Sequence, residues 1–151
     1  NDNSNFNRKT DLLLYLAARS ENIDLFKKNH KKKIILIDRF VDSTVAYQHY
    51  GFGIDLNLIN LINSHILKKF KVDFTFLNII DQKNMIKRLK SRKSLNRYDK
   101  FKQKFYLKVQ NGFLTLAKKN KKKYKIIDSN LDKKVNKLLV INELEKLIWV
   151  K

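Results

Sequence analysis

The sequence predicts an α/β fold, a three-layer arrangement of a parallel sheet with helices on both faces, from two observations. Short apolar runs rich in β-branched residues alternate with longer segments whose apolar residues repeat at helical spacing. Alternating strands and helices of these lengths form right-handed crossover units, which join parallel strands. The 151 residues contain no proline, no repeat and no shift in composition, so we expect a single domain over residues 1–151.

The first half of the chain predicts a helix, a strand and a second helix. Leu12 to Phe26 carries apolar residues at helical spacing, with Thr10 as a candidate N-cap. The run from Ile34 to Ile37 is short and largely β-branched, which is typical of a strand buried on both faces. Asp55 is placed to cap the next helix. The apolar side chains of that helix, at i, i+3, i+4 and i+8, are Leu58, Leu61, Ile62 and Ile66.

The second half continues the alternation. Phe74 to Ile80 is the second strand candidate, and Asp81 can cap a helix that extends to about Arg92. After a polar stretch from Lys93 to Asp99, a long helix is predicted from Phe105, Val109, Gly112, Phe113 and Leu116. Tyr124 to Ile127 is the third strand candidate. A closing helix that ends near Trp149 is predicted from Val135, Leu138, Leu139, Leu144 and Ile148.

The composition and charge limit the kinds of molecule that this protein is expected to bind. The formal net charge of +20 would attract nucleic acid, anionic lipid or phosphorylated small molecules. The lysine runs at 31–33 and 118–123 are not interleaved with aromatic residues, which favours a solvated surface over a single-strand binding groove. There is no cysteine, no long apolar run and no secretory signal pattern at residues 1–7. We therefore expect a soluble cytoplasmic protein with no membrane partner and no specific nucleic-acid partner.

Three motifs occur in a fixed order along the chain. Residues 12–19 place Tyr15 four positions before Arg19, and residues 38–48 read Asp-Arg-Phe-Val-Asp-Ser-Thr-Val-Ala-Tyr-Gln. Residues 88–97 carry three arginines in and after a predicted helix. These motifs resemble the acceptor-site helix, the Asp-Arg-Tyr-x-x-Ser-x-x-Ala-Tyr-Gln signature and the arginine-rich lid of the thymidylate kinases, which are P-loop nucleoside monophosphate kinases. The resemblance extends from about Leu12 to Ser129, which is most of the chain.

One element of that family is not found in the sequence. No Gly-x-x-x-x-Gly-Lys-Ser/Thr stretch occurs among the 151 residues, although such a loop holds the phosphates of ATP. In the family this loop follows a strand that lies mid-sheet, between the equivalents of the first two strands predicted here. The resemblance therefore implies the C-terminal portion of a longer kinase, which lacks the N-terminal strand and helix that flank the phosphate-binding loop, and we expect these residues alone to be inactive.

The resemblance implies phosphoryl transfer from ATP to dTMP, giving dTDP and ADP, with Mg²⁺ as cofactor. This chemistry depends chiefly on positioning and charge neutralisation, because the attacking phosphate oxygen is already ionised. Arg39 would bind the acceptor phosphate, and Asp38 would reach the magnesium ion through water. The ring of Tyr15 would stack on the pyrimidine, while Arg19 would hydrogen-bond at the edge of the base.

The remaining site residues follow from the same resemblance. Thr44 matches the position that contacts the thymine edge, and Tyr47 matches the one beside the sugar, which favours deoxyribose. Ser43 and Gln48 are expected to be neighbours in the pocket. The lid residues Arg88, Arg92 and Arg97 would close over the triphosphate and stabilise the transition state. The resemblance also implies a homodimer.

Other interpretations of these residues remain open. Asp38 and Arg39 also fit a plain surface pair, and Tyr15 fits a core aromatic residue beside a solvated arginine. The lid arginines also fit a solvated basic helix end, which the helix dipole favours. Among functions, a deoxynucleoside kinase, a basic nucleic-acid-binding module and a non-functional or split kinase remnant are the alternatives to a dTMP kinase.

Overall fold

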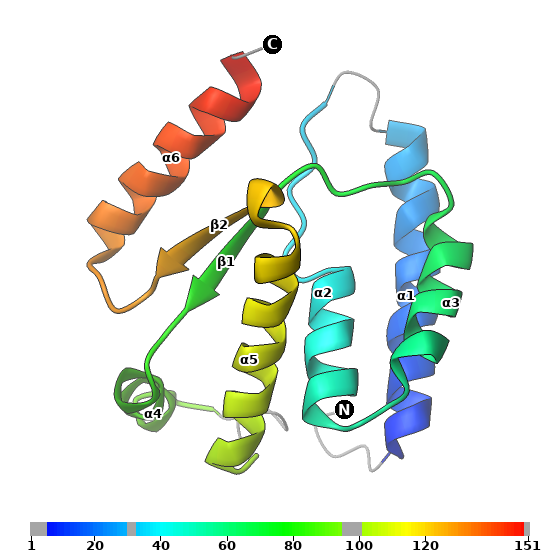
Figure 1. Ribbon diagram of the computed structural model, residues 1–151, viewed down its shortest axis with the longest axis horizontal. Helices are drawn as coiled ribbons and strands as arrows, with labels where there is room; N and C mark the ends of the chain where they lie inside the picture. The colour runs from blue at the N-terminus through cyan, green and yellow to red at the C-terminus, as the bar shows by residue number, and fades with distance from the viewer. Residues whose placement is uncertain (1–5, 30–32, 95–100, 150–151) are drawn as a thin grey trace. The chain divides into compact units, whose positions relative to one another are not determined.

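The computed structural model describes residues 6–29, 33–94 and 101–149. By their internal contacts these residues form two compact units, and Figure 1 labels the helices and strands that make them up. The first unit is drawn from residues 1–72 and 101–116, and the second from residues 73–100 and 117–151. None of the helices in these described ranges has the length and apolar character needed to cross a membrane.

The first unit is helical. Its elements are α1 (Arg8–Asn29), α2 (Val41–Thr44), the π-helix η1 (Val45–Gly51), α3 (Leu56–Leu67) and most of α5 (Gln103–Lys119). The predicted cap Thr10 is wrong, because the side chain of Asn7 accepts a hydrogen bond from the Thr10 amide at 2.9 Å. Asparagine caps as well as threonine does, and here it lies one turn earlier. The predicted cap Asp55 is confirmed, since its carboxylate accepts from the Leu58 amide at 2.8 Å.

The core of the first unit joins α1, η1 and α3. It consists of the buried side chains Leu12, Leu16, Val45 and Ile59. The prediction that Leu58 and Leu61 belong to the buried face of α3 is wrong, because both are exposed. The buried face is instead centred on Ile59 and Asn63. Apolar residues occupy most faces of this helix, so their spacing alone does not select the face that packs.

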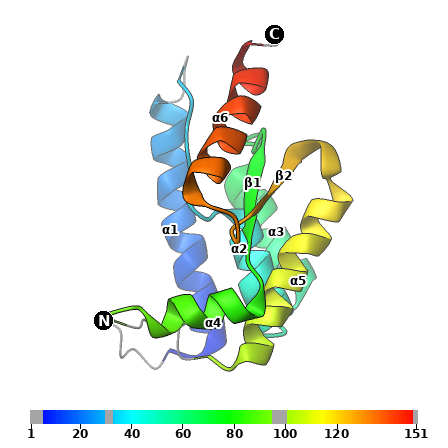
Figure 2. The ribbon, with the colours of Figure 1, turned by 90° about the vertical axis from the view of Figure 1, so that its left-hand side faces the viewer.

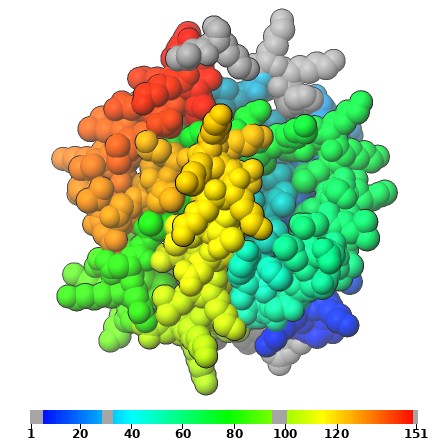
Figure 3. Space-filling model, in the orientation of Figure 1, coloured from blue at the N-terminus to red at the C-terminus, as the bar shows by residue number. Residues whose placement is uncertain are grey.

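A close approach between η1 and α5 depends on a glycine. In Figure 3 the surfaces of these two elements, cyan and yellow-green, are in contact. A Cβ atom added at Gly112 would lie 2.6 Å from Cδ2, 2.7 Å from Cγ and 2.9 Å from Cβ of Tyr50. These atoms lie at the base of the tyrosine side chain, and the nearby Cβ atom cannot move without displacing the backbone of η1. Gly112 is therefore needed for packing.

We expect Gly112→Ala to destabilise the protein by about 1–3 kcal/mol through overpacking against Tyr50. Without that contact the same substitution inside a helix would stabilise it by roughly 1 kcal/mol. Thermal unfolding followed by circular dichroism measures the change. The matched control is Gly112→Ala in a Tyr50→Ala background, where the substitution should be neutral or stabilising. An equal loss in both backgrounds would contradict this packing explanation.

The second unit contains the sheet. Strands β1 (Thr75–Ile79) and β2 (Tyr124–Asp128) pair in parallel and lie side by side in Figure 2, with Thr75 opposite Tyr124 and Ile79 opposite Asp128. The helices of this unit are α4 (Gln82–Lys90), the short 3₁₀ helix η2 (Lys121–Lys123) and α6 (Lys133–Trp149). The predicted α/β class with a parallel sheet is thus confirmed. The predicted cap Asp81 is also confirmed, because it accepts from the Asn84 amide at 2.8 Å.

The first predicted strand is wrong. Residues 34–37 have no regular secondary structure, and the sheet of the described residues consists of β1 and β2. Ile34 is 66% exposed and Leu36 is 81% exposed, whereas a strand buried on both faces was expected. A strand exists only as part of a hydrogen-bonded ladder. A β-branched apolar run is therefore not sufficient when no described segment forms a ladder with it.

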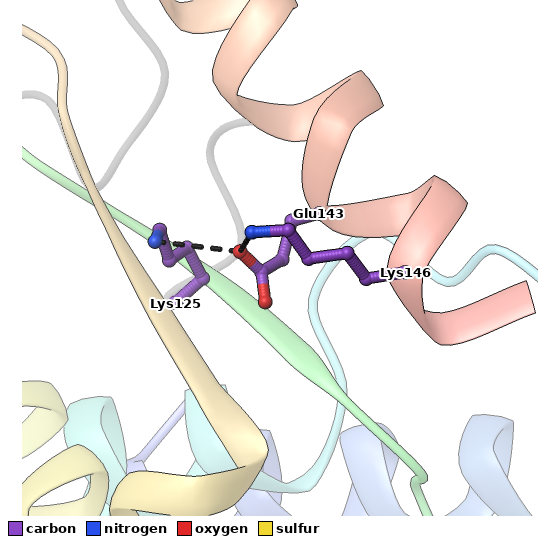
Figure 4. Close-up of polar contacts among 3 residues, drawn as sticks. All are labelled: Lys125, Glu143 and Lys146. Carbon is purple, nitrogen blue, oxygen red and sulfur yellow. Dashed lines mark ion pairs between the residues drawn. The ribbon is translucent and has the colours of Figure 1, made fainter. Parts of the chain in front are cut away.

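Helix α6 is linked to β2 by charge. Glu143 of α6 lies 3.4 Å from the Nζ atom of Lys125 on β2 and 3.8 Å from that of Lys146 (Figure 4). Pairs as exposed as these contribute little to stability. They show which side of α6 faces the strand, and they use one of the few carboxylates in a strongly basic chain.

Candidate functional site

Arg19 of α1 lies at the centre of a hydrogen-bonded group in the first unit. It is 8% exposed, and its Nη1 donates to Oδ1 of Asn63 on α3 at 2.8 Å. Its Nη2 donates to the backbone oxygen of Phe40 at 3.2 Å and to Oγ1 of Thr44 at 2.6 Å. The guanidinium also lies over the Phe40 ring, with Cζ 5.3 Å from the ring centroid. One side chain therefore joins α1 and α3 to both ends of α2.

The electrostatics of this group favour an additional acceptor. Burial lowers the pKa of Arg19 from its ordinary value, and the negative charge of Asp42 opposes that shift. Nε of Arg19 and Nδ2 of Asn63 are buried donors for which the described residues supply no acceptor. A buried donor without an acceptor is costly. A water molecule or the carbonyl oxygen of a ligand would therefore be stabilised here.

Arg39 occupies a strained turn before α2. Its φ is 60°, in the left-handed region that residues with a Cβ atom seldom adopt. This conformation costs about 1–2 kcal/mol, and such residues cluster at functional sites. Its Cζ lies 5.2 Å from the centroid of the Tyr47 ring. A guanidinium that stacks through its face directs its N–H groups sideways, where a phosphate or carboxylate can bind them in a bidentate manner.

Tyr47 is held by a π-helical turn. The amide of Phe52 donates to the backbone oxygen of Tyr47 at 3.0 Å, which spans five residues. The Tyr47 ring meets the edges of Phe105 and Phe113 on α5, at centroid distances of 6.1 and 6.3 Å. Gln48, the next residue, is buried. Wide turns of this kind are rare and frequently occur at functional sites, and the sequence pattern did not predict one here.

The other predicted acceptor residues lie on the same elements. Tyr15 is 42% exposed and lies one turn before Arg19 on α1. The amide of Ser43 donates to the backbone oxygen of Phe40 at 3.1 Å, which begins the turn of α2. The structure thus brings Arg19 together with Thr44, and Arg39 together with Tyr47. Asn63 was missed by the sequence analysis, although it lies in the same helical row as Ile59.

Asp38 is the residue predicted to hold Mg²⁺. Its side chain is exposed, and within the described ranges there is no cluster of three or more metal-binding side chains. Magnesium usually keeps several waters and needs only one or two carboxylates besides phosphate oxygens. One accessible carboxylate next to Arg39 therefore fits a magnesium ion held through water and a nucleotide, and does not fit an all-protein metal cage.

The predicted lid lies in the second unit. Nη2 of Arg88 donates to the backbone oxygen of Ser129 at 2.6 Å, so the end of α4 is tied to the turn after β2. That turn is itself ordered by Asn130, whose Oδ1 accepts from the Asp81 amide at 3.2 Å. Arg92 is exposed just beyond α4. Arg97 lies outside the described residues.

The chain is similar to known proteins over most of its length. A sequence model of the family described as "Thymidylate kinase" matches residues 1–139. A thymidylate kinase of Trichodesmium erythraeum is 37% identical over 142 residues, which cover 92% of this chain and 63% of that protein. A thymidylate kinase of Ehrlichia canis is also 37% identical, over 80% of this chain and 58% of that protein.

A solved structure agrees with the sequence comparisons. The crystal structure of a thymidylate kinase from Ehrlichia chaffeensis matches with a TM-score of 0.72 and 30% sequence identity. The match covers 93% of this chain and 68% of that one. The chain therefore spans less than two thirds of the length of the curated relatives named above.

Proposed function

This chain belongs to the thymidylate kinase family, and from that premise we propose that it forms the acceptor side of a kinase that transfers a phosphoryl group from ATP to dTMP. The products would be dTDP and ADP. The observation that carries the proposal is the 2.6 Å hydrogen bond from Arg19 to Thr44. It joins, across 25 positions of sequence, the two residues whose family positions contact the thymine edge.

The geometry of this pair supports recognition of a 4-oxo pyrimidine. The hydroxyl oxygen of Thr44 accepts from Arg19, so its own proton remains available to a base carbonyl. The buried donor on Nε of Arg19 favours the same kind of acceptor. Cytosine presents an amino group where thymine presents O4. That amino group is a donor and could not pair with the Thr44 hydroxyl proton or with Nε of Arg19, which are donors as well. The half-exposed ring of Tyr15 supplies a stacking surface one turn away.

Arg39 and Tyr47 support binding of the sugar and phosphate. The strained turn and the ring of Tyr47 hold the Arg39 guanidinium in one orientation, which suits a bidentate contact with the acceptor phosphate. Tyr47 would lie beside the deoxyribose, with Ser43 and Gln48 as neighbours. When bound, Mg²⁺ would neutralise charge on the phosphates of ATP, and Asp38 would hold it through water.

Arginines of the second unit would serve the donor side. Arg88, Arg92 and Arg97 would contact the triphosphate, and the bond from Arg88 to Ser129 places one of them beside the turn after β2. The 151 residues contain no phosphate-binding loop motif, so turnover should require that loop from another polypeptide segment. We also propose a cytoplasmic homodimer. The apolar side chains that α1 and α3 leave exposed, among them Leu13 and Leu61, suit such an interface.

Calorimetric titration of this 151-residue chain with nucleotides tests the proposal. We expect dTMP to bind and dCMP to bind at least about tenfold more weakly, because a site built for one hydrogen-bonding pattern leaves polar groups unpaired with another. The alternative, a basic nucleic-acid-binding module, predicts affinity for many oligonucleotides that falls steeply with salt, and no preference for dTMP. That second pattern would reject the proposal.

Thr44 offers a matched pair of variants. Thr44→Ser keeps the hydroxyl that accepts from Arg19 and should retain most of the preference for dTMP over dCMP. Thr44→Val has a similar shape without the hydroxyl and should lose about 1–3 kcal/mol of dTMP binding, the usual cost of an unpaired charged donor. The ratio of the two dissociation constants is measured for each variant. Equal ratios in the two variants would contradict a role for the hydroxyl.

A further inference from the structure

Asn63 is a buried polar residue in the middle of an apolar helix face. It is 3% exposed, and it lies on α3 between Ile59, which is fully buried, and Ile66, which packs against the core. Burying an amide is unfavourable unless its groups are hydrogen-bonded. Its known contact is with Arg19, at 2.8 Å and 44 positions away in sequence. Contact with that arginine is therefore the reason that the structure offers for an amide at this position.

The hydrogen-bonding inventory fixes how the amide is turned. A guanidinium carries only donors, so the side-chain oxygen of Asn63 must face Arg19. The amide nitrogen is then directed elsewhere, in agreement with the absence of an acceptor for Nδ2 among the described residues. Leucine, whose side chain has the same number of heavy atoms and the same branching, lacks any polar group. The side-chain oxygen is thus the atom through which Asn63 holds Arg19.

That oxygen restricts the arginine in a way that the other contacts do not. Phe40 and Thr44 both bind Nη2, which is one corner of the guanidinium. The Phe40 ring covers one face of the guanidinium, with Cζ 5.3 Å from the ring centroid, but contacts at one corner still leave the group able to turn within its own plane. Asn63 holds the second corner, Nη1, and together the two corners fix the orientation of the group within that plane. Three of the five N–H groups of Arg19 are then hydrogen-bonded. Because the guanidinium is rigid, these three bonds also set the direction of the N–H group on Nε.

On this basis, and given the proposed recognition of dTMP, we propose that Asn63 is a positioning residue for base selection. It does not contact the nucleotide. It holds the Arg19 guanidinium at Nη1 so that the remaining donors of Arg19 and the hydroxyl of Thr44 meet the edge of a 4-oxo pyrimidine. The preference for dTMP over dCMP then depends on an oxygen acceptor at position 63.

The test uses the 151-residue chain and calorimetric titration with dTMP and dCMP. We expect Asn63→Leu to weaken dTMP binding about tenfold or more while leaving dCMP binding nearly unchanged, since losing one hydrogen bond to a charged group has an effect of this size. Asn63→Asp retains an oxygen acceptor and should stay within about threefold of the wild-type preference. Far-ultraviolet circular dichroism confirms that each variant is folded. If Asn63→Leu does not fold, Asn63→Ala removes the amide without adding bulk.

A double-mutant cycle separates positioning from simple packing. In an Arg19→Met background the oxygen of Asn63 has no guanidinium to hold, so Asn63→Leu should no longer change the ratio of dTMP to dCMP affinity. The same change in ratio in both backgrounds would overturn the inference, as would wild-type preference in Asn63→Leu or Asn63→Ala. Failure of the wild-type chain to bind dTMP would instead reject the proposed function, and this inference with it.

Discussion

Arg19→Met should weaken dTMP binding about a hundredfold, because hydrogen bonds to a charged group contribute about 1.5–3 kcal/mol each and 1.4 kcal/mol is a factor of ten. The substitution removes the donor at the base edge and leaves the Thr44 hydroxyl without the partner that orients it. Methionine fills a similar volume and is easily accommodated in a core. Loss of affinity would therefore reflect lost hydrogen bonds and not a collapsed site. Titration with dTMP measures the change.

The effect of Arg19→Met on stability should be much smaller than its effect on binding. Three acceptors lose their donor, which destabilises the fold. Against this, the burial that lowers the pKa of Arg19 also means that the charge is unfavourable in the folded protein, and methionine avoids that desolvation cost. Because the two effects oppose each other, we expect a loss in unfolding free energy of no more than about 2 kcal/mol.

Arg19→Lys is the matched control for charge. Lysine keeps the positive charge, but it is a compact ammonium on a flexible stem and cannot span the acceptors on Asn63 and Thr44 at once. Its affinity for dTMP should therefore lie near that of Arg19→Met. If Arg19→Lys bound dTMP as the wild type does, charge alone would explain the role of this residue and the planar contacts would be incidental.

Sequence reasoning succeeded where the cause is local. The caps Asp55 and Asp81 were predicted because an aspartate just before an apolar helical pattern satisfies amide groups three positions later. The parallel pairing of β1 and β2 followed from two apolar runs separated by helical segments. These features need only a few neighbouring residues, so they can be read from one sequence.

It failed where the outcome depends on distant partners. Residues 34–37 have the composition of a buried strand, but a strand requires a hydrogen-bonded partner, and the sheet of the described residues consists of β1 and β2. The buried face of α3 is decided by what packs on it, since its apolar residues surround the helix. The contact between Asn63 and Arg19 spans 44 positions, and no local pattern marks a polar residue in an apolar row as its partner.

In the candidate site, too, the sequence predicted some features and the structure alone revealed the others. The resemblance singled out Arg19, Thr44, Arg39 and Tyr47 as separate motif positions, and the structure adds that they are in contact as two pairs. The π-helical turn that carries Tyr47 could not be expected from composition, because such turns depend on backbone hydrogen bonds that skip one residue more than usual. The positive φ of Arg39 could not be predicted either, because arginine is not one of the residue types that favour this conformation.

Arg39→Ala should weaken dTMP binding about a hundredfold while leaving the binding of thymidine, which has no phosphate, within about twofold. The guanidinium is the group proposed to meet the acceptor phosphate, and a bidentate charged contact contributes roughly 2–3 kcal/mol. Its loss should not affect recognition of the base, which depends on Arg19 and Thr44. Parallel titrations with dTMP and thymidine measure the two effects. An equal loss for both ligands would mean that Arg39 acts on the shape of the site.

Arg39→Gly controls for the strained backbone at this position. Glycine adopts a φ of 60° without the penalty that alanine meets, so Arg39→Gly should be about 1 kcal/mol more stable than Arg39→Ala. Thermal unfolding compares the two variants. Both should lose dTMP affinity equally, because neither carries the guanidinium. If Arg39→Gly recovered binding, the backbone conformation rather than the charge would be the functional feature, and the acceptor phosphate would have to be assigned to another residue.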